Sequence, residues 1–341
     1  MRSRLKFLLK CFAATIVITV IAGVVYEQLG RRSDKRRFPQ IGRSVDIGGR
    51  TLNIFCSGEG APTVVLEGEV GFRWTPIQRE VARFTRACWY DRAGYGWSDP
   101  APRARTAAAM ANDLRALLRA ASESPPYVLV GASGDAFPVR VFAGKYPDDA
   151  AGLVLVDPRH EDYREPDSDL GWANRLPAPV RGALLNVVPA AHGVGLIRLT
   201  GRTSRPSNPD HRPEGMTPED ARYLHFLYRL PKTVVADADE GRHLPASGEE
   251  ARAAGHFGNR PLIVLTAGKL RVPPDPRDLP DIQAFHQRKL HEWHPQLARL
   301  SSRGRQIILH DSAHGIQFEA RPALVDAIRQ VLDDSRAAQL R

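Results

Sequence analysis

Apolar and polar positions alternate along the chain in blocks that predict a mixed α/β protein. Short apolar runs typical of buried strands occur at 62–67, 87–91, 126–132, 151–157, 261–268 and 306–310. Alternating polarity predicts two edge strands joined by Gly48-Gly49, at 43–47 and 51–56. Helical spacing predicts helices over 74–84, 106–121, 136–146, 178–188, 217–230, 281–300 and 322–332. Since strands and helices alternate from residue 62 to 157, we expect right-handed crossovers and a parallel, doubly wound sheet.

The strongest apolar run lies near the N-terminus. Between Phe7 and Tyr26 the only charged residue is Lys10, and about 20 such residues cross a ~30 Å hydrocarbon core as a helix. We therefore expect residues 1–40 to be a single-pass membrane anchor and a basic linker. A secretory signal peptide is the alternative, but no polar segment precedes the candidate cleavage site at 20–22. Basic residues flank the run on both sides and leave its orientation open.

A serine follows the apolar run at 126–132 in a turn before a predicted helix. The segment Gly131-Ala132-Ser133-Gly134-Asp135 resembles the G-x-S-x-G nucleophile elbow of the α/β-hydrolase family. The resemblance implies that Ser133 is the nucleophile and that the Gly134 N–H points at the oxyanion. Asp135 replaces the last glycine of the pattern, and its carboxylate would oppose the oxyanion charge. We therefore expect Asp135→Gly to raise turnover.

A second motif supports the same resemblance. Residues 91–99 are similar to the D-R-x-G-x-G-x-S-D turn of α/β-hydrolases, which is structural in that family. The resemblance covers residues 43 to 335 and implies a mostly parallel central sheet flanked by helices, with a helical cap inserted after the sixth strand. It divides the chain into a first core part at 41–158, a cap at 159–258 and a second core part at 259–341.

The resemblance also implies a catalytic serine, acid and histidine in that chain order. His314 occupies the family's position for the general base, in the loop after the last strand, and His310 is its rival. Asp157, at the end of the sixth strand, is the favoured acid, with Asp275 and then Asp278 as alternatives. The second oxyanion N–H maps onto Glu69 or its neighbour, although a loop glutamate without a role is an equal alternative.

Composition excludes several other classes of protein. The net charge is +10, but basic residues concentrate near the N-terminus and are otherwise interspersed with acids, so we expect no nucleic-acid partner. Three cysteines without C-x-x-C spacing argue against a zinc site and a disulfide framework, and predict that Cys56 and Cys88 are small buried residues. The histidines at 286, 291 and 294 are expected on a solvated helix face, so no metal and no cofactor is expected.

These observations favour a membrane-anchored enzyme that hydrolyses a small-molecule carboxylic ester. A serine hydroxyl needs an imidazole to accept its proton, and the imidazole needs a carboxylate to hold its tautomer. The alternative is a non-catalytic protein of the same fold that binds a ligand at the membrane, for which Asp135 is the main support.

Overall fold

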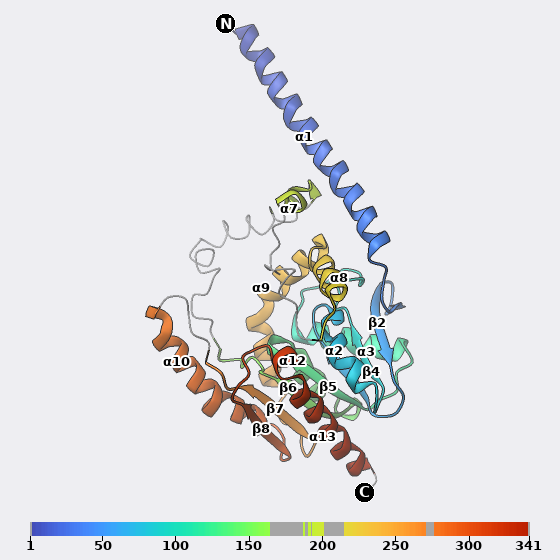
Figure 1. Ribbon diagram of the computed structural model, residues 1–341, viewed down its shortest axis with the longest axis vertical. Helices are drawn as coiled ribbons and strands as arrows, with labels where there is room; N and C mark the ends of the chain where they lie inside the picture. The colour runs from blue at the N-terminus through green and yellow to red at the C-terminus, as the bar shows by residue number, and fades with distance from the viewer. Residues whose placement is uncertain are drawn as a thin grey trace.

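The computed structural model describes residues 2–163, 187, 190–191, 193–200, 215–270 and 276–339. An eight-stranded sheet lies at its centre in the order β1-β2-β4-β3-β5-β6-β7-β8 (Figure 1). The strands are β1 (Arg43–Asp46), β2 (Thr51–Ser57), β3 (Thr63–Glu67), β4 (Ala87–Tyr90), β5 (Tyr127–Ala132), β6 (Ala150–Val156), β7 (Leu262–Ala267) and β8 (Gly304–Leu309). Only β2 runs antiparallel to its neighbours β1 and β4, so the predicted parallel sheet is confirmed from β4 to β8.

Helices cover both faces of the sheet. In β5, Val128 and Val130 belong to a core shared with α2 (Thr75–Val81) and α13 (Arg321–Gln339). Leu129 belongs to the opposite core, shared with α3 (Ala107–Ala120) and α4 (Ala136–Lys145). Successive side chains of a strand point to opposite faces, and a strand buried on both faces must therefore be apolar throughout. This burial explains the continuous apolar runs in the sequence.

Three described helices connect β6 to β7, namely α7 (Leu196–Thr200), α8 (Pro218–Tyr228) and α9 (Pro231–Ala253). The helix predicted at 217–230 is confirmed, and Thr217 begins it with a capping box. The helix predicted at 178–188 lies largely outside the described residues. Ser247 and Glu250 of α9 accept hydrogen bonds from the first backbone N–H groups of α3, which have no partner within their own helix.

The segment before β8 differs from the single helix predicted at 281–300. It consists of α10 (Leu279–Arg288), a π-helical turn η5 (Lys289–Trp293) and α11 (His294–Ala298). The expectation of a solvated histidine face is wrong for His286 and His294, because their exposed fractions are 8% and 1%. The remaining short elements are η1 (Gly71–Trp74), η2 (Ser133–Asp135), η3 (Pro147–Asp149), η4 (Pro276–Asp278) and α12 (Ile316–Glu319).

The N-terminal apolar run forms the first part of α1 (Arg2–Arg37), which projects away from the body of the protein (Figure 1). Among the described residues it is the one helix long and apolar enough to cross a membrane, with a mean hydropathy of 2.4 in its most apolar window. None of that window is buried. The helix does not contribute to the hydrophobic cores on either face of the sheet.

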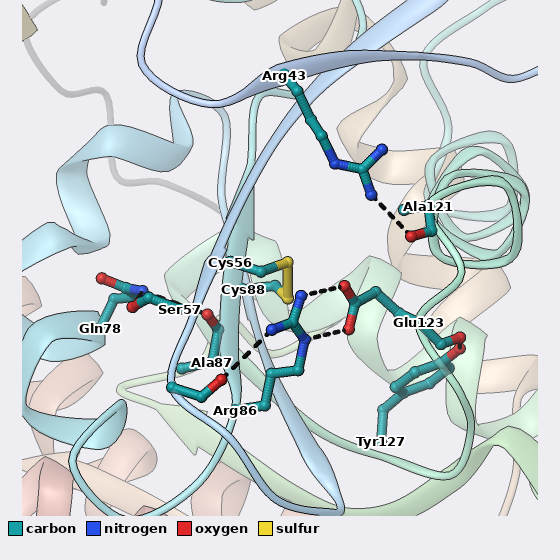
Figure 2. Close-up of a disulfide and its surroundings, with 11 residues drawn as sticks. Arg43, Cys56, Ser57, Gln78, Arg86, Ala87, Cys88, Ala121, Glu123 and Tyr127 are labelled. Carbon is teal, nitrogen blue, oxygen red and sulfur yellow. Dashed lines mark hydrogen bonds and ion pairs between the residues drawn. A yellow bond between two sulfur atoms is a disulfide. The ribbon is translucent and has the colours of Figure 1, made fainter.

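Cys56 and Cys88 form a disulfide between β2 and β4, which corrects the expectation of two unpaired cysteines (Figure 2). The two residues lie directly opposite each other in the antiparallel register, with their Cα atoms 4.1 Å apart. Arg86, bound through two hydrogen bonds to Glu123, lies beside the bridge. Sequence spacing did not reveal the pair because the two strands are separated along the chain by β3.

Candidate active site

Ser133 lies at a sharp turn between β5 and α4. Its φ of 55° is in the left-handed region, which non-glycine residues adopt at an energetic cost of roughly 1–3 kcal/mol. The turn brings strand and helix so close that a Cβ on Gly131 would lie 2.6 Å from the carbonyl oxygen of Asp135. The turn places Ser133 after the carboxyl end of β5, where the sequence pattern predicts a nucleophile elbow.

Asp157 and His314, 157 positions apart in the chain, meet at the same edge of the sheet. The distance from His314 Nδ1 to Asp157 Oδ2 is 2.7 Å. The aspartate directly follows β6 and is 4% exposed, whereas the histidine side chain is 66% exposed. No hydrogen bond joins Ser133 to His314, both of which are described. Catalytic hydrogen bonds are often long in structures without substrate and shorten when the substrate binds.

Two groups hold the Asp157 carboxylate besides His314. The backbone N–H of Ala267 donates to Oδ1 at 2.9 Å, and Lys289 Nζ lies 3.2 Å from the same oxygen. Burial alone would raise the pKa of Asp157, but the hydrogen bond from His314 and the Lys289 charge outweigh it and lower that pKa to about 2. Asp157 is therefore ionised at neutral pH, which suits a group that orients an imidazole and stabilises its charged form.

His294 supports the loop that carries Asp157. Its Nε2 lies 2.9 Å from the carbonyl oxygen of Pro158, and its Nδ1 lies 2.7 Å from Thr266 Oγ1. Burial lowers the pKa of His294 to about 4, so the ring is neutral. Because a carbonyl can only accept, we assign the proton to Nε2. The residue fixes the position of Pro158 next to Asp157.

The rival residues do not contact this pair. His310 is exposed in the turn after β8, and Asp278 is exposed at the start of α10. Within the part of the chain that is described, neither forms a hydrogen bond or an ion pair with Asp157 or His314. Asp275 lies outside the described residues. The structure thus brings Asp157 and His314 together and leaves His310 and Asp278 apart from them.

Asp135 contacts a buried arginine. Arg92 Nη2 donates to Asp135 Oδ1 at 2.7 Å and lies 3.2 Å from Glu240 Oε2 of α9, and all three side chains are at most 13% exposed. Burial raises the pKa of Asp135 to about 6, although Arg92 acts in the opposite direction. The carboxylate is therefore not an uncompensated charge beside Ser133, and the basis for expecting Asp135→Gly to raise turnover is removed.

Two glutamates lie at the end of β3 and just after it. Glu67 is fully buried, its Oε2 accepts a hydrogen bond from the Tyr90 hydroxyl, and burial raises its pKa to about 8, so it is protonated at neutral pH. The Glu69 side chain lies 3.3 Å from Arg73 and 3.4 Å from the Tyr228 hydroxyl of α8. The Glu69 side chain thus connects the loop after β3 to α8 of the cap.

Arg92→Met is expected to destabilise the protein by about 3 kcal/mol, because it leaves the buried Asp135 without its ion-pair partner and Glu240 with Arg105 alone. A change of that size lowers the thermal midpoint by roughly 6 °C or more in a domain of this size. Without Arg92 the pKa values of these acids rise further above their unfolded values. The loss of unfolding free energy relative to wild type is thus greatest near pH 8. It becomes smaller as the pH falls toward 5, because the acids become protonated.

Thermal unfolding followed by circular dichroism at both pH values measures this effect. Arg303→Met is the matched control, because Arg303 pairs with Asp334 at the surface, where an ion pair contributes about 1 kcal/mol or less. Equal midpoints for the two variants, or a deficit of Arg92→Met that does not change with pH, would contradict the role of Arg92.

Sequence reasoning missed Lys289, Arg92 and Glu240 as residues of this region. Lys289 lies four residues before the buried Trp293 on one helical face, and this spacing was the available signal. Arg92 is part of the 91–99 turn, to which only a structural role was given. Glu240 offered no signal, because its contact with Arg92 depends on how α9 packs against the core.

The fold and this sheet edge define a hydrolase-type architecture, and comparison with known proteins agrees. A family model described as the alpha/beta hydrolase fold matches residues 54–319. The chain belongs to this family.

Solved structures and curated relatives are similar over different lengths. A thermophilic esterase from Thermogutta terrifontis is 22% identical with a TM-score of 0.56, covering 87% of this chain and 99% of that one. The enol-lactonase from Burkholderia xenovorans LB400 is 16% identical with a TM-score of 0.56, covering 85% and 100%. The uncharacterized Bacillus subtilis proteins YbdG and YqjL are 22% and 35% identical over 45% and 30% of this chain. The chain spans less than half the length of these two relatives, 49% and 41%.

Proposed function

We propose that the chain hydrolyses a carboxylic ester with Ser133 as nucleophile, His314 as general base and Asp157 as the acid that orients it. The observation that carries the proposal is the 2.7 Å hydrogen bond between His314 Nδ1 and Asp157 at the sheet edge where the elbow presents Ser133. The esterase and lactonase folds in the comparison support the class of reaction but not the substrate.

The proposed reaction proceeds through an acyl-enzyme. Asp157 accepts a hydrogen bond from the Nδ1–H of His314, and this tautomer leaves Nε2 free to take the Ser133 proton as Oγ bonds to the ester carbonyl carbon. His314 then protonates the departing alcohol as the C–O bond breaks. Water, deprotonated by His314, attacks the acyl carbon, and His314 returns the proton to Ser133 Oγ as the bond between the acyl carbon and Oγ breaks and the acid leaves. All protons in these steps move through side chains of the chain, and the reaction requires no metal or cofactor.

We assign oxyanion stabilisation to two backbone N–H groups. Gly134 follows the nucleophile, and Glu69 lies in the loop after β3, the two positions from which donors of this type come in such folds. Glu69 would act through its backbone alone, since its side chain contacts Arg73 and Tyr228.

A serine-directed fluorophosphonate probe tests the nucleophile on the full chain in detergent. We expect Ser133 Oγ to displace fluoride from the probe and the label to disappear in Ser133→Ala. Ser302→Ala, at an exposed turn, is the control and should label like the wild type. Labelling that survives Ser133→Ala assigns the nucleophile elsewhere.

The second candidate is a non-catalytic binding protein of the same fold. Its support is the departure of Asp135 from the elbow glycine, although the ion pair with Arg92 offsets the charge of that residue. A folded wild-type chain that takes up no fluorophosphonate label and turns over no ester would support this candidate over the enzyme.

We further propose that α1 anchors the chain in a membrane, with the hydrolase body on an oxidising side. Disulfides form and persist in such compartments and are rare in the reducing cytosol, and Cys56–Cys88 is paired whereas Cys11 of α1 is not. The contacts of α1 with the cap, through Glu27 and Asp34 to Arg198, are those of a retained helix and not of a removed signal peptide.

Thiol trapping in cells tests this topology. Without reduction we expect one maleimide-polyethylene glycol tag per chain, on Cys11, and three tags after reduction, one for each cysteine of the sequence. Cys88→Ser should take two tags without reduction because it frees Cys56. Three tags on the unreduced wild type would place the hydrolase body in a reducing compartment, and the absence of any Cys11 tag after reduction would indicate a cleaved N-terminus.

A further inference from the structure

A cavity of about 600 Å³ lies between the last turns of α1 and the helices of the cap. Its volume is within the range of small-molecule sites, roughly 300–1,000 Å³. Its walls come from α1, from Gly96 and Trp97 of the turn after β4, from Arg198 of α7, from α8 and from the start of α9. Ser133, Asp157 and His314 are not among its lining residues, so it is separate from the candidate active site.

The cavity combines an aromatic wall with an excess of positive charge. Phe38, Trp97 and Phe226 form the aromatic part, and Phe38 stacks on Phe226 with ring centroids 5.1 Å apart. Seven described lining residues are lysines or arginines and two are acidic. The basic residues besides Arg198 are Arg31, Lys35, Arg37, Arg222, Arg229 and Lys232.

The two acids of the cavity are already occupied by arginines. Arg198 binds Glu27 at 2.9 Å and Asp34 at 2.7 Å, and Arg31 also binds Glu27. The positive charge of Lys35, Arg222 and Lys232 is therefore not balanced by these carboxylates. Burial lowers the pKa of Lys232. The charges of Asp91 and Asp99 act in the opposite direction, and the nearby charge of Lys35 lowers the pKa further. An anion bound between them would relieve this repulsion.

The cavity lies at one end of the apolar run of α1. The run ends at Tyr26, and the α1 residues that line the cavity begin at Glu27 and end at Arg37. At about 1.5 Å per residue they extend from the edge of the hydrocarbon core through a headgroup layer of roughly 5–8 Å and beyond. The position of the cavity is thus that of the membrane surface.

The cap touches α1 at the same level. A Cβ on Gly23 would lie 2.2 Å from the carbonyl oxygen of Val194, so Val194, just before α7, packs directly on the apolar run. Leu196 and Leu199 of α7 are 49% and 74% exposed, and Leu29 of α1 is 58% exposed. Exposed leucines beside the end of a membrane-spanning run are suited to contact with acyl chains.

We propose that this cavity binds the headgroup of an anionic phospholipid. Lys35, Arg222 and Lys232 contact the phosphate, and the aromatic wall packs against the glycerol and the first methylene groups. Lys232 donates to the carbonyl oxygen of Ser98 at 2.7 Å and, as an ammonium group, has further protons to donate. The site would fix the cap relative to the membrane, because its walls join α1 to α8 and α9.

Native mass spectrometry of the full chain in a neutral detergent tests the proposal. Phosphatidylglycerol and phosphatidylcholine with the same acyl chains are added separately, and the retained lipid is counted per protein. We expect wild type to retain phosphatidylglycerol in preference to phosphatidylcholine. The double variant Lys35→Gln/Arg222→Gln should lower that retention by roughly 10-fold or more, the effect expected of two basic side chains near an anionic lipid.

Arg32→Gln/Arg36→Gln is the matched control, because it removes the same charge from exposed positions of α1 that do not line the cavity. It should change retention less than about 2-fold, because the electrostatic contribution of a basic residue depends on its being close to the anionic headgroup. Unchanged thermal midpoints verify that both variants fold. Equal losses in both double variants, equal retention of the two lipids, or binding of inorganic phosphate without retained lipid would each overturn the proposal.

Discussion

His314→Ala is expected to lower the turnover of a p-nitrophenyl ester by about four orders of magnitude, the scale on which a catalytic triad loses rate with one member. Without the imidazole, no side chain at the position of His314 can accept the Ser133 proton. Because the His314 side chain is 66% exposed, its removal leaves little unfilled volume, and the fold should be retained. Ester hydrolysis by the full chain in detergent measures the rate, and circular dichroism verifies the fold.

His310→Ala is the control for this variant. His310 lies four residues earlier in the chain, is also exposed, and has no recorded contact with Asp157. Its turnover should stay within a few-fold of wild type. A larger loss in His310→Ala than in His314→Ala would show that the general base is the residue directly after β8.

Asp157→Asn is expected to cost about 10⁴-fold in kcat, the typical effect of replacing a triad aspartate by its amide. The amide oxygen can still accept from the Ala267 N–H, but the amide NH₂ would then face His314 Nδ1 and favour the wrong tautomer. It would also face Lys289, which the carboxylate attracts. Rates across pH should therefore fall by a similar factor throughout the active range.

Asp278→Asn is the matched control, because Asp278 is exposed at the start of α10 and should retain near wild-type turnover. Stability provides a second readout. The pKa of Asp157 is lowered to about 2, so the stability that its charge contributes is present above pH ~4 and lost as the pH falls through 2. The difference in stability between wild type and Asp157→Asn should shrink in that acid range. A milder loss in Asp157→Asn than in Asp278→Asn would remove Asp157 from the triad.

The disulfide and the Arg92 cluster connect distant parts of the sequence. Cys56–Cys88 joins β2 to β4, and closing a loop of 32 residues contributes roughly 3–4 kcal/mol in the chain-entropy account. Arg92 contacts Asp135 after the elbow and Glu240 of the cap. Neither feature includes a proposed catalytic residue. Both connect elements of the core or the cap that are distant in the sequence.

The sequence by itself determined the order and type of most elements. Buried parallel strands must be apolar on both faces, and β3, β5, β6 and β7 are short apolar runs for that reason. The elbow could also be predicted, because the turn at Gly131 and Ser133 requires a close backbone approach that depends only on neighbouring residues. Asp157 could be predicted as a strand-end residue, because the carboxyl ends of parallel strands lie at one edge of a sheet. His314 was predicted only through the family resemblance, which places a histidine in the loop after the last strand.

Tertiary structure alone decided which distant side chains meet. Cys56 opposes Cys88 only because β2 and β4 are neighbours in the sheet, and Asp135 is compensated only because the turn after β4 brings Arg92 to it. Lys289 reaches Asp157 through a π-helical turn that helical spacing did not predict. Local propensity and periodicity report on residues a few positions apart, whereas these contacts depend on strand order and helix packing, which no short stretch of sequence encodes.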